Sequence, residues 1–108
     1  MNKINVMLIA RMMVERMKQL RRGSRLTSSQ VARYLHIDLK LYILIESGEV
    51  TVTGEIVEKL CALYGCKEKV LYDENEKLVC HDMHALNEAS LEKVADVRKL
   101  YARYVNVL

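Results

Sequence analysis

The chain has 108 residues, of which 51% are hydrophobic and 29% charged, so it fits one small folded domain and excludes a disordered polyelectrolyte. It contains no Pro, Trp or Phe and only four Gly, and this scarcity of helix breakers predicts an all-α protein. The net charge of +3 hides an asymmetry, because residues 1–40 carry nine Lys or Arg against two acidic residues, while residues 41–108 carry eight against twelve. The basic front of the chain therefore fits a polyanionic partner as well as an ordinary solvated surface.

The first predicted helix runs from about Asn5 to Arg22, because apolar residues recur there at intervals of three and four. Additional apolar residues widen the buried face enough to contact two neighbours, such as another helix and another subunit. Gly23 follows directly and predicts a glycine that ends the helix in a left-handed conformation. Arg11 and Glu15 interrupt the apolar stretch, so we expect neither a signal peptide nor a membrane span, and a cytoplasmic location is the default.

Two short amphipathic helices come next. Thr27 with Gln30 three residues later matches the capping box that begins a helix. Asp38 is positioned to cap the following helix, which ends before Gly48 and whose core positions should be Leu41, Tyr42 and Ile45. Paired helices joined by so tight a turn are typical of a helix-turn-helix at about residues 27–47, whose second helix enters the major groove of DNA.

Thr53 caps a fourth predicted helix that ends at Gly65, and Lys67–Tyr72 forms a short fifth helix. We therefore expect a helix-turn-helix domain over residues 5–72, a polar linker over residues 73–86 and a C-terminal helix over residues 87–107.

The C-terminal helix carries a short apolar seam with alternating spacings of three and four residues. This seam predicts packing against the first helix or against a second copy, and we favour a homodimer. Its members are Val94, Val97, Tyr101, Tyr104 and Leu108.

No residue pattern indicates catalysis, a cofactor or a metal ion. Cys61, Cys66 and Cys80 are odd in number, which argues against a closed disulfide framework. Cys80 lies close to His81, Asp82 and His84, which also have metal-binding side chains, but no second cluster has matching spacing and we predict no metal site. The sequence also lacks a glycine-rich phosphate loop and a nucleophile elbow, so we do not expect an enzyme.

Residues 11–72 resemble the Cro/repressor-type (XRE, lambda-repressor-like) helix-turn-helix domains. The resemblance rests on a Leu-Thr helix start, a Val-Ala and Leu pattern, an Ile-Glu-x-Gly close and the apolar pattern of the fourth helix. The matching positions are Leu26, Thr27, Val31, Ala32, Leu35, Ile37, Ile45, Glu46, Gly48, Leu60, Leu63 and Gly65.

The resemblance implies a five-helix domain that binds double-stranded DNA as a dimer and regulates transcription. It also implies that Glu46 pairs with Arg21 and stabilises the fold. The implied base-reading positions are Leu39, Lys40, Ile43 and Leu44. The implied phosphate contacts come from Arg25, Ser28, Ser29, Lys40, Ser47 and Thr51.

Several positions depart from the family pattern. His36 stands at a turn position usually held by glycine, and Ser28 replaces a DNA-contacting glutamine. Of the base-reading positions only Lys40 carries a side chain suited to hydrogen-bonding a purine. The apolar third helix therefore leaves two alternatives to DNA binding, namely a surface that docks a protein partner and a helix buried by the tail or another subunit.

Overall fold

The computed structural model describes the backbone of residues 3–107 and the side chains of residues 6–103. The described backbone contains helices, turns and loops without a strand, so the prediction of an all-α fold with an additional C-terminal helix is confirmed. The six helices are α1 (Lys3–Gly23), α2 (Ser28–Leu35), α3 (Leu39–Glu46), α4 (Gly54–Tyr64), α5 (Lys69–Tyr72) and α6 (Glu88–Val107). None of the helices in this part of the chain is long and apolar enough to cross a membrane.

Local capping signals set most helix boundaries. The Thr27 hydroxyl accepts a hydrogen bond from the Gln30 amide at 3.1 Å, and the Gln30 side chain accepts one from the Thr27 amide at 2.8 Å. This confirms the predicted capping box. At α4 the Thr53 hydroxyl accepts a hydrogen bond from the Ile56 amide at 3.3 Å, and Gly65 ends the helix in a left-handed conformation. Asp38 occupies the N-cap position of α3, but its side chain makes no capping hydrogen bond.

The predicted role of Gly23 is wrong. Gly23 lies within the last turn of α1, and the residue with positive φ is Arg25, at 59°. A Cβ atom at position 23 would lie only 2.4 Å from the sulfur of Cys80. The glycine is therefore needed because another segment passes close to the helix, and not because the helix turns left-handed there.

The core is formed by buried residues from all six described helices. Met17 and Leu20 of α1 are fully buried, as is Tyr42 of α3. The prediction that Leu41 lies in the core is wrong. Leu41 remains 37% exposed, and Glu46 is buried instead. The short helix α3 buries positions 42, 45 and 46, which share one face, and Leu41 falls at the edge of that face.

The segment that follows α5 runs along the outside of the domain and packs against it. The Met83 amide donates a hydrogen bond to the Ser24 carbonyl at 2.9 Å, and the Met83 side chain is buried. Arg16 of α1 donates to the backbone carbonyls of Val70 and Glu76. Residues 73–86 thus contribute contacts to the fold as well as connecting α5 to α6.

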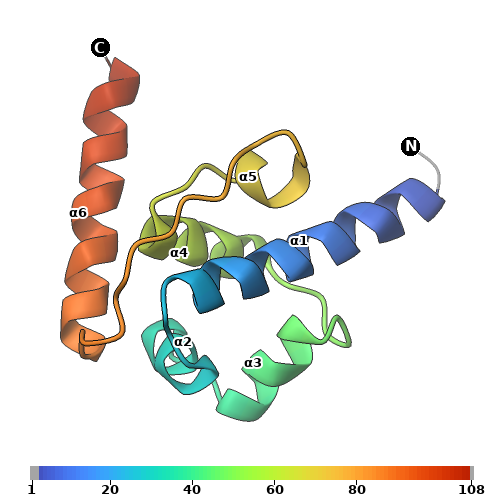
Figure 1. The fold of residues 1–108 in the computed structure, drawn as a ribbon, viewed down its shortest axis with the longest axis horizontal. Helices are drawn as coiled ribbons and strands as arrows, with labels where there is room; N and C mark the ends of the chain where they lie inside the picture. Colours follow the sequence, from blue (N-terminus) through green and yellow to red (C-terminus); the bar gives the residue numbers. More distant parts are fainter. Residues whose placement is uncertain (1–2, 108) are drawn as a thin grey trace.

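Helix α6 stands beside α4 and α2 (Figure 1). Its first half buries Leu91 and Ala95 against them. Its second half extends past the core, and both Val97 and Tyr101 are exposed there.

Candidate nucleic-acid interface

The orientation of α3 relative to α1 is fixed by an ion pair. Arg21 donates two hydrogen bonds to Glu46, from Nε to Oε2 at 2.7 Å and from Nη2 to Oε1 at 3.0 Å. The Tyr42 hydroxyl donates a further hydrogen bond to the same carboxylate. The predicted pairing of Arg21 with Glu46 is therefore confirmed, and its bidentate geometry restricts rotation of α3 about its axis.

The surroundings of this pair favour a charged Arg21 and a protonated Tyr42. The hydrogen bond to Glu46 raises the pKa of Arg21, and burial raises the pKa of Tyr42 far above its usual range. Arg21 is therefore charged and Tyr42 is a hydrogen-bond donor at neutral pH.

The turn between α2 and α3 depends on a left-handed residue. His36 has φ 57° and ψ 42°, and its amide donates to the backbone carbonyls of α2. His36 therefore takes the left-handed conformation that glycine usually adopts at this turn position, at some cost in strain.

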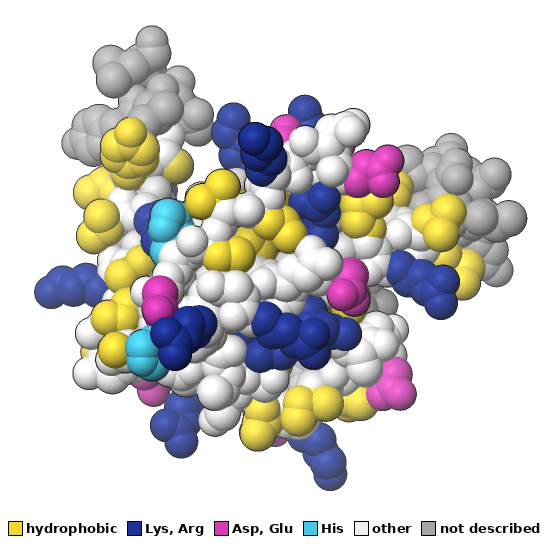
Figure 2. All heavy atoms as spheres, viewed as in Figure 1, with side chains coloured by type: hydrophobic (Ala, Val, Ile, Leu, Met, Phe, Trp, Pro, Cys, Tyr) yellow, Lys and Arg dark blue, Asp and Glu magenta, His cyan; other side chains and the backbone are white. Residues whose placement is uncertain are grey.

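The outer face of α3 is mainly apolar. Leu39 is 42% exposed and Ile43 is 51% exposed, while Leu44 is half-buried. Lys40 and Ser47 are also exposed, and the Ser47 hydroxyl donates to the Leu44 carbonyl at 2.9 Å. Figure 2 shows hydrophobic side chains along the lower edge of the molecule, over α3, with Lys or Arg side chains nearby.

The remaining predicted contact residues lie on several elements. Ser28 and Ser29 form the first turn of α2 and are half-buried, and Thr51 is exposed in the loop before α4. Arg25 precedes α2, and its guanidinium lies 3.1 Å from a carboxylate oxygen of Asp82. A phosphate at Arg25 would therefore compete with Asp82.

Asp82 belongs to a small polar cluster with His84 and Arg25, and sequence reasoning missed the part played by Arg25. Its carboxylate accepts a hydrogen bond from the His84 amide at 3.1 Å and lies 2.8 Å from His84 Nδ1. These hydrogen bonds, together with Arg25, lower the pKa of Asp82 to about 2. Nothing local in the sequence pairs Arg25 with Asp82, because the contact requires the segment after α5 to fold back over α1.

The cysteines occupy three different environments. Cys61 is buried, Cys66 is half-buried and Cys80 is exposed, and all three are free. Cys80 lies against Gly23, so its thiol packs on α1.

A group of ligating side chains lies on another part of the surface and was not predicted. His36, Glu88 and Glu92 bring one ligand atom each to within 4.8 Å of one another. The spacing of the two glutamates on one helix face was readable from the sequence, but their approach to His36 depends on how α6 docks.

Comparison with known proteins agrees with this architecture. A family model described as a helix-turn-helix domain matches residues 13–71, which is more than half of the chain and extends from within α1 to α5. No curated protein and no solved structure matches the chain. The chain therefore belongs to this helix-turn-helix domain family, the type of domain found in DNA-binding regulators.

Proposed function

We propose that the protein is a transcriptional regulator of the phage-repressor type that places α3 in the major groove of double-stranded DNA. The observation that carries this proposal is the way α3 is held. The Arg21–Glu46 pair and the buried Tyr42 fix one side of the helix, while Leu39, Lys40 and Ile43 face solvent on the other. A rigid helix with a solvent-facing side is what major-groove binding requires.

The affinity would come mostly from phosphate contacts. The first turn of α2 places the hydroxyls of Ser28 and Ser29 at the positive end of a helix dipole, a combination that favours anions. Lys40 at the start of α3 adds a positive charge, and Ser47 and Thr51 flank the far end of the same helix. Arg25 would contribute by exchanging Asp82 for a phosphate.

The specificity would come from few direct contacts. Lys40 is the one side chain of the outer face of α3 that can donate hydrogen bonds to guanine. Leu39, Ile43 and Leu44 can contact thymine methyl groups, which discriminates weakly. We therefore expect the shape and deformability of the operator to contribute a large share of the sequence preference.

The test is binding to random-sequence duplex DNA, measured by fluorescence anisotropy at low and moderate salt. We expect clear binding at low salt with a steep salt dependence, because each neutralised phosphate releases counterions. Lys40→Ala should weaken binding and reduce the salt slope by about one phosphate contact. Lys99→Ala, which removes an exposed lysine of α6, is the matched control and should leave both quantities unchanged.

Absence of binding even at low salt would contradict the proposal. The exposed apolar face of α3 would then be a docking surface for a protein partner. An unchanged affinity and slope in Lys40→Ala would remove α3 from the DNA contact even if the protein binds DNA through another surface.

We further propose that the regulator is a homodimer in which the second half of α6 contacts a second copy. Val94 packs on the core, but Val97, Leu100 and Tyr101 are 61%, 54% and 71% exposed. The remaining predicted residues, Tyr104 and Leu108, lie outside the described side chains. An apolar helical face that projects from the domain would be covered by an identical face across a two-fold axis, as an operator of two half-sites requires.

A further inference from the structure

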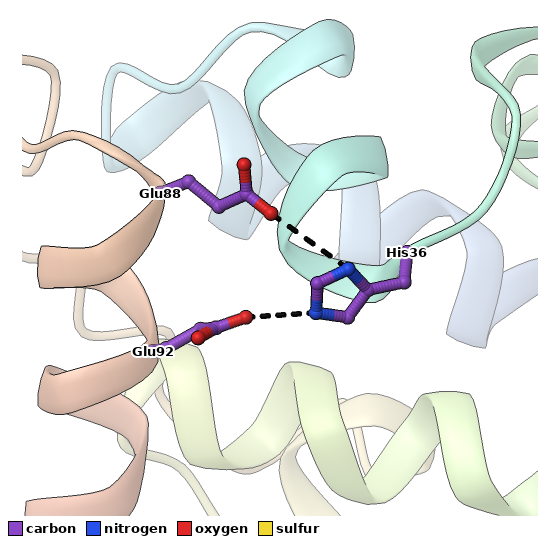
Figure 3. A group of neighbouring side chains, drawn as sticks. All are labelled: His36, Glu88 and Glu92. Atoms are coloured by element: carbon purple, nitrogen blue, oxygen red, sulfur yellow. Dashed lines mark hydrogen bonds and ion pairs between the residues drawn. The ribbon is translucent and has the colours of Figure 1, made fainter.

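His36, Glu88 and Glu92 form a cluster to which the proposed DNA interface assigns no role (Figure 3). The Nε2 atom of His36 lies 2.8 Å from Glu92 Oε1, and its Nδ1 atom lies 3.7 Å from Glu88 Oε1. Figure 3 shows the imidazole pointing from the turn after α2 toward α6, from which both carboxylates project to meet it.

The three side chains are brought together by rigid parts of the fold. Glu88 and Glu92 are one helical turn apart, so they share a face of α6. The neighbouring residues Leu91 and Ala95 are buried and hold that face against the domain. His36 is fixed by the left-handed turn, so the cluster does not depend on a free loop.

The cluster has an excess of negative charge. Two carboxylates one turn apart on a helix repel each other, and the imidazole offsets one charge only when it is protonated. A divalent cation would neutralise both carboxylates at once.

We propose that His36, Glu88 and Glu92 bind a divalent first-row transition-metal ion, for which Zn²⁺ is the representative. One imidazole nitrogen and one oxygen from each carboxylate would be the protein ligands, a set of donors that Zn²⁺ accepts. Ligand atoms about 2 Å from a tetrahedral ion are roughly 3.3 Å apart, so atoms already within 4.8 Å would come closer by side-chain rotation, with one carboxylate turning toward the ring nitrogen that binds the ion. The three side chains are 63%, 45% and 43% exposed, which leaves room for the ion to enter with bound water.

The ion would connect two parts of the chain that are distant in sequence. His36 belongs to the turn of the helix-turn-helix, and both glutamates belong to α6. Metal binding would therefore strengthen the docking of α6 on the helix-turn-helix, and the folded state would gain stability from the ion.

The test is a calorimetric titration of the reduced full chain with Zn²⁺, without DNA. We expect one ion per chain and a thermal unfolding midpoint that rises with the Zn²⁺ concentration. His36→Asn removes the imidazole but keeps a residue that tolerates the left-handed turn, and Glu92→Gln removes a charge but keeps the shape of the side chain. Each should lower the affinity by about tenfold or more and reduce the thermal shift.

His84→Asn is the matched control, because His84 is another exposed histidine beside a carboxylate and should not be needed for the ion. A wild-type chain that binds no stoichiometric Zn²⁺ would overturn the proposal, as would full affinity in both His36→Asn and Glu92→Gln. Loss of binding in His84→Asn alone would place the ion in the segment around Cys80 and would also overturn it. Because DNA is absent from the titration, the outcome is independent of the DNA-binding proposal.

Discussion

Glu46 is the one buried carboxylate among the side chains that the structure describes, and Arg21 is its counter-ion. A buried ion pair contributes little net stability against an apolar replacement of both partners, but removing one partner leaves an uncompensated charge. The value of this pair therefore lies mainly in fixing the position of α3. Replacing one partner should therefore lower the free energy of unfolding much more than replacing both.

Arg21→Met should lower the free energy of unfolding by about 3 kcal/mol, because Glu46 would remain buried without its partner. The double variant Arg21→Met with Glu46→Leu should recover most of that loss. Urea unfolding followed by circular dichroism measures both. A single variant as stable as the wild type would show that solvent reaches the carboxylate.

Tyr34 gives a prediction about alkaline pH. Burial is the largest reason that the pKa of Tyr34 is raised to about 12, and its hydroxyl donates to the Lys59 carbonyl at 2.7 Å. The folded state therefore keeps the proton at a pH at which the unfolded tyrosine, with its ordinary pKa of about 10, loses it. The stability from this group is complete below pH 10 and is lost as the pH rises through 12.

Nuclear magnetic resonance of ring-labelled tyrosine can follow the ionisation of Tyr34 directly. Asp96→Asn should lower the pKa of Tyr34, because Asp96 makes the largest contribution after burial. Glu55→Gln, on an exposed part of α4, is the matched control. An unchanged Tyr34 titration in Asp96→Asn would mean that burial alone sets the pKa.

At the scale of the helices, the two glycines at the ends of α4 differ in backbone conformation and in the space around them. Gly65 ends α4 with φ 70°, and a Cβ atom there would lie 3.1 Å from Nε of Arg98 on α6. Gly54 begins the helix without a positive φ, and a Cβ atom there would meet nothing within 4 Å. Arg98 in turn donates to the Leu63 carbonyl near the end of α4.

Gly65→Ala should therefore lower the free energy of unfolding by about 1–2 kcal/mol, which is the cost of a left-handed residue with a Cβ atom. Gly54→Ala is the internal control and should raise it by about 0.5–1 kcal/mol, because it reduces the freedom of the unfolded chain. Thermal or urea unfolding of the two variants side by side measures the difference. Equal effects of the two alanines would contradict the assigned backbone roles.

The elements also show what the sequence could and could not predict. The Thr27 and Thr53 caps and the Gly65 terminus depend on residues within one turn, so local pattern was sufficient. Gly23 was misassigned because its reason is Cys80, more than fifty residues further along the chain. Leu41 was misassigned because a helix of eight residues leaves the edge of its buried face undefined until its neighbours are placed.

The same division applies to the candidate sites. The Arg21–Glu46 pair and the outward positions of α3 both came from the family resemblance. The cluster of His36, Glu88 and Glu92 could not be predicted, because it exists only once α6 has docked on the domain. Periodicity in α6 indicated an apolar seam, but it could not separate the half that packs inward from the half that projects.

For the molecule as a whole, that projecting half predicts the oligomeric state. Val97→Lys combined with Tyr101→Lys should convert a dimer into a monomer by placing charge on the proposed contact face, as measured by light scattering. Ala89→Lys adds a charge at an exposed position near the start of α6 and should leave the mass unchanged. A dimer that survives the double substitution would exclude this face.

Point substitutions test the proposed dimer contact more cleanly than a deletion of residues 87–108 would. That deletion would also remove Leu91 and Ala95 from the core, so a lost dimer could follow from a damaged fold. The two exposed positions on α6 leave those contacts intact.

The packing of α6 also has a consequence for the order in which the protein can fold during synthesis. Residues 13–71 are the part that matches the family, but Leu91, Ala95 and Met83 cover surfaces of that part from later in the chain. A nascent chain that has emerged only as far as α5 still exposes apolar surface on α4 to water. The domain can therefore reach its final packing only after α6 has left the ribosome. Until then the nascent chain exposes an apolar surface that chaperones can bind.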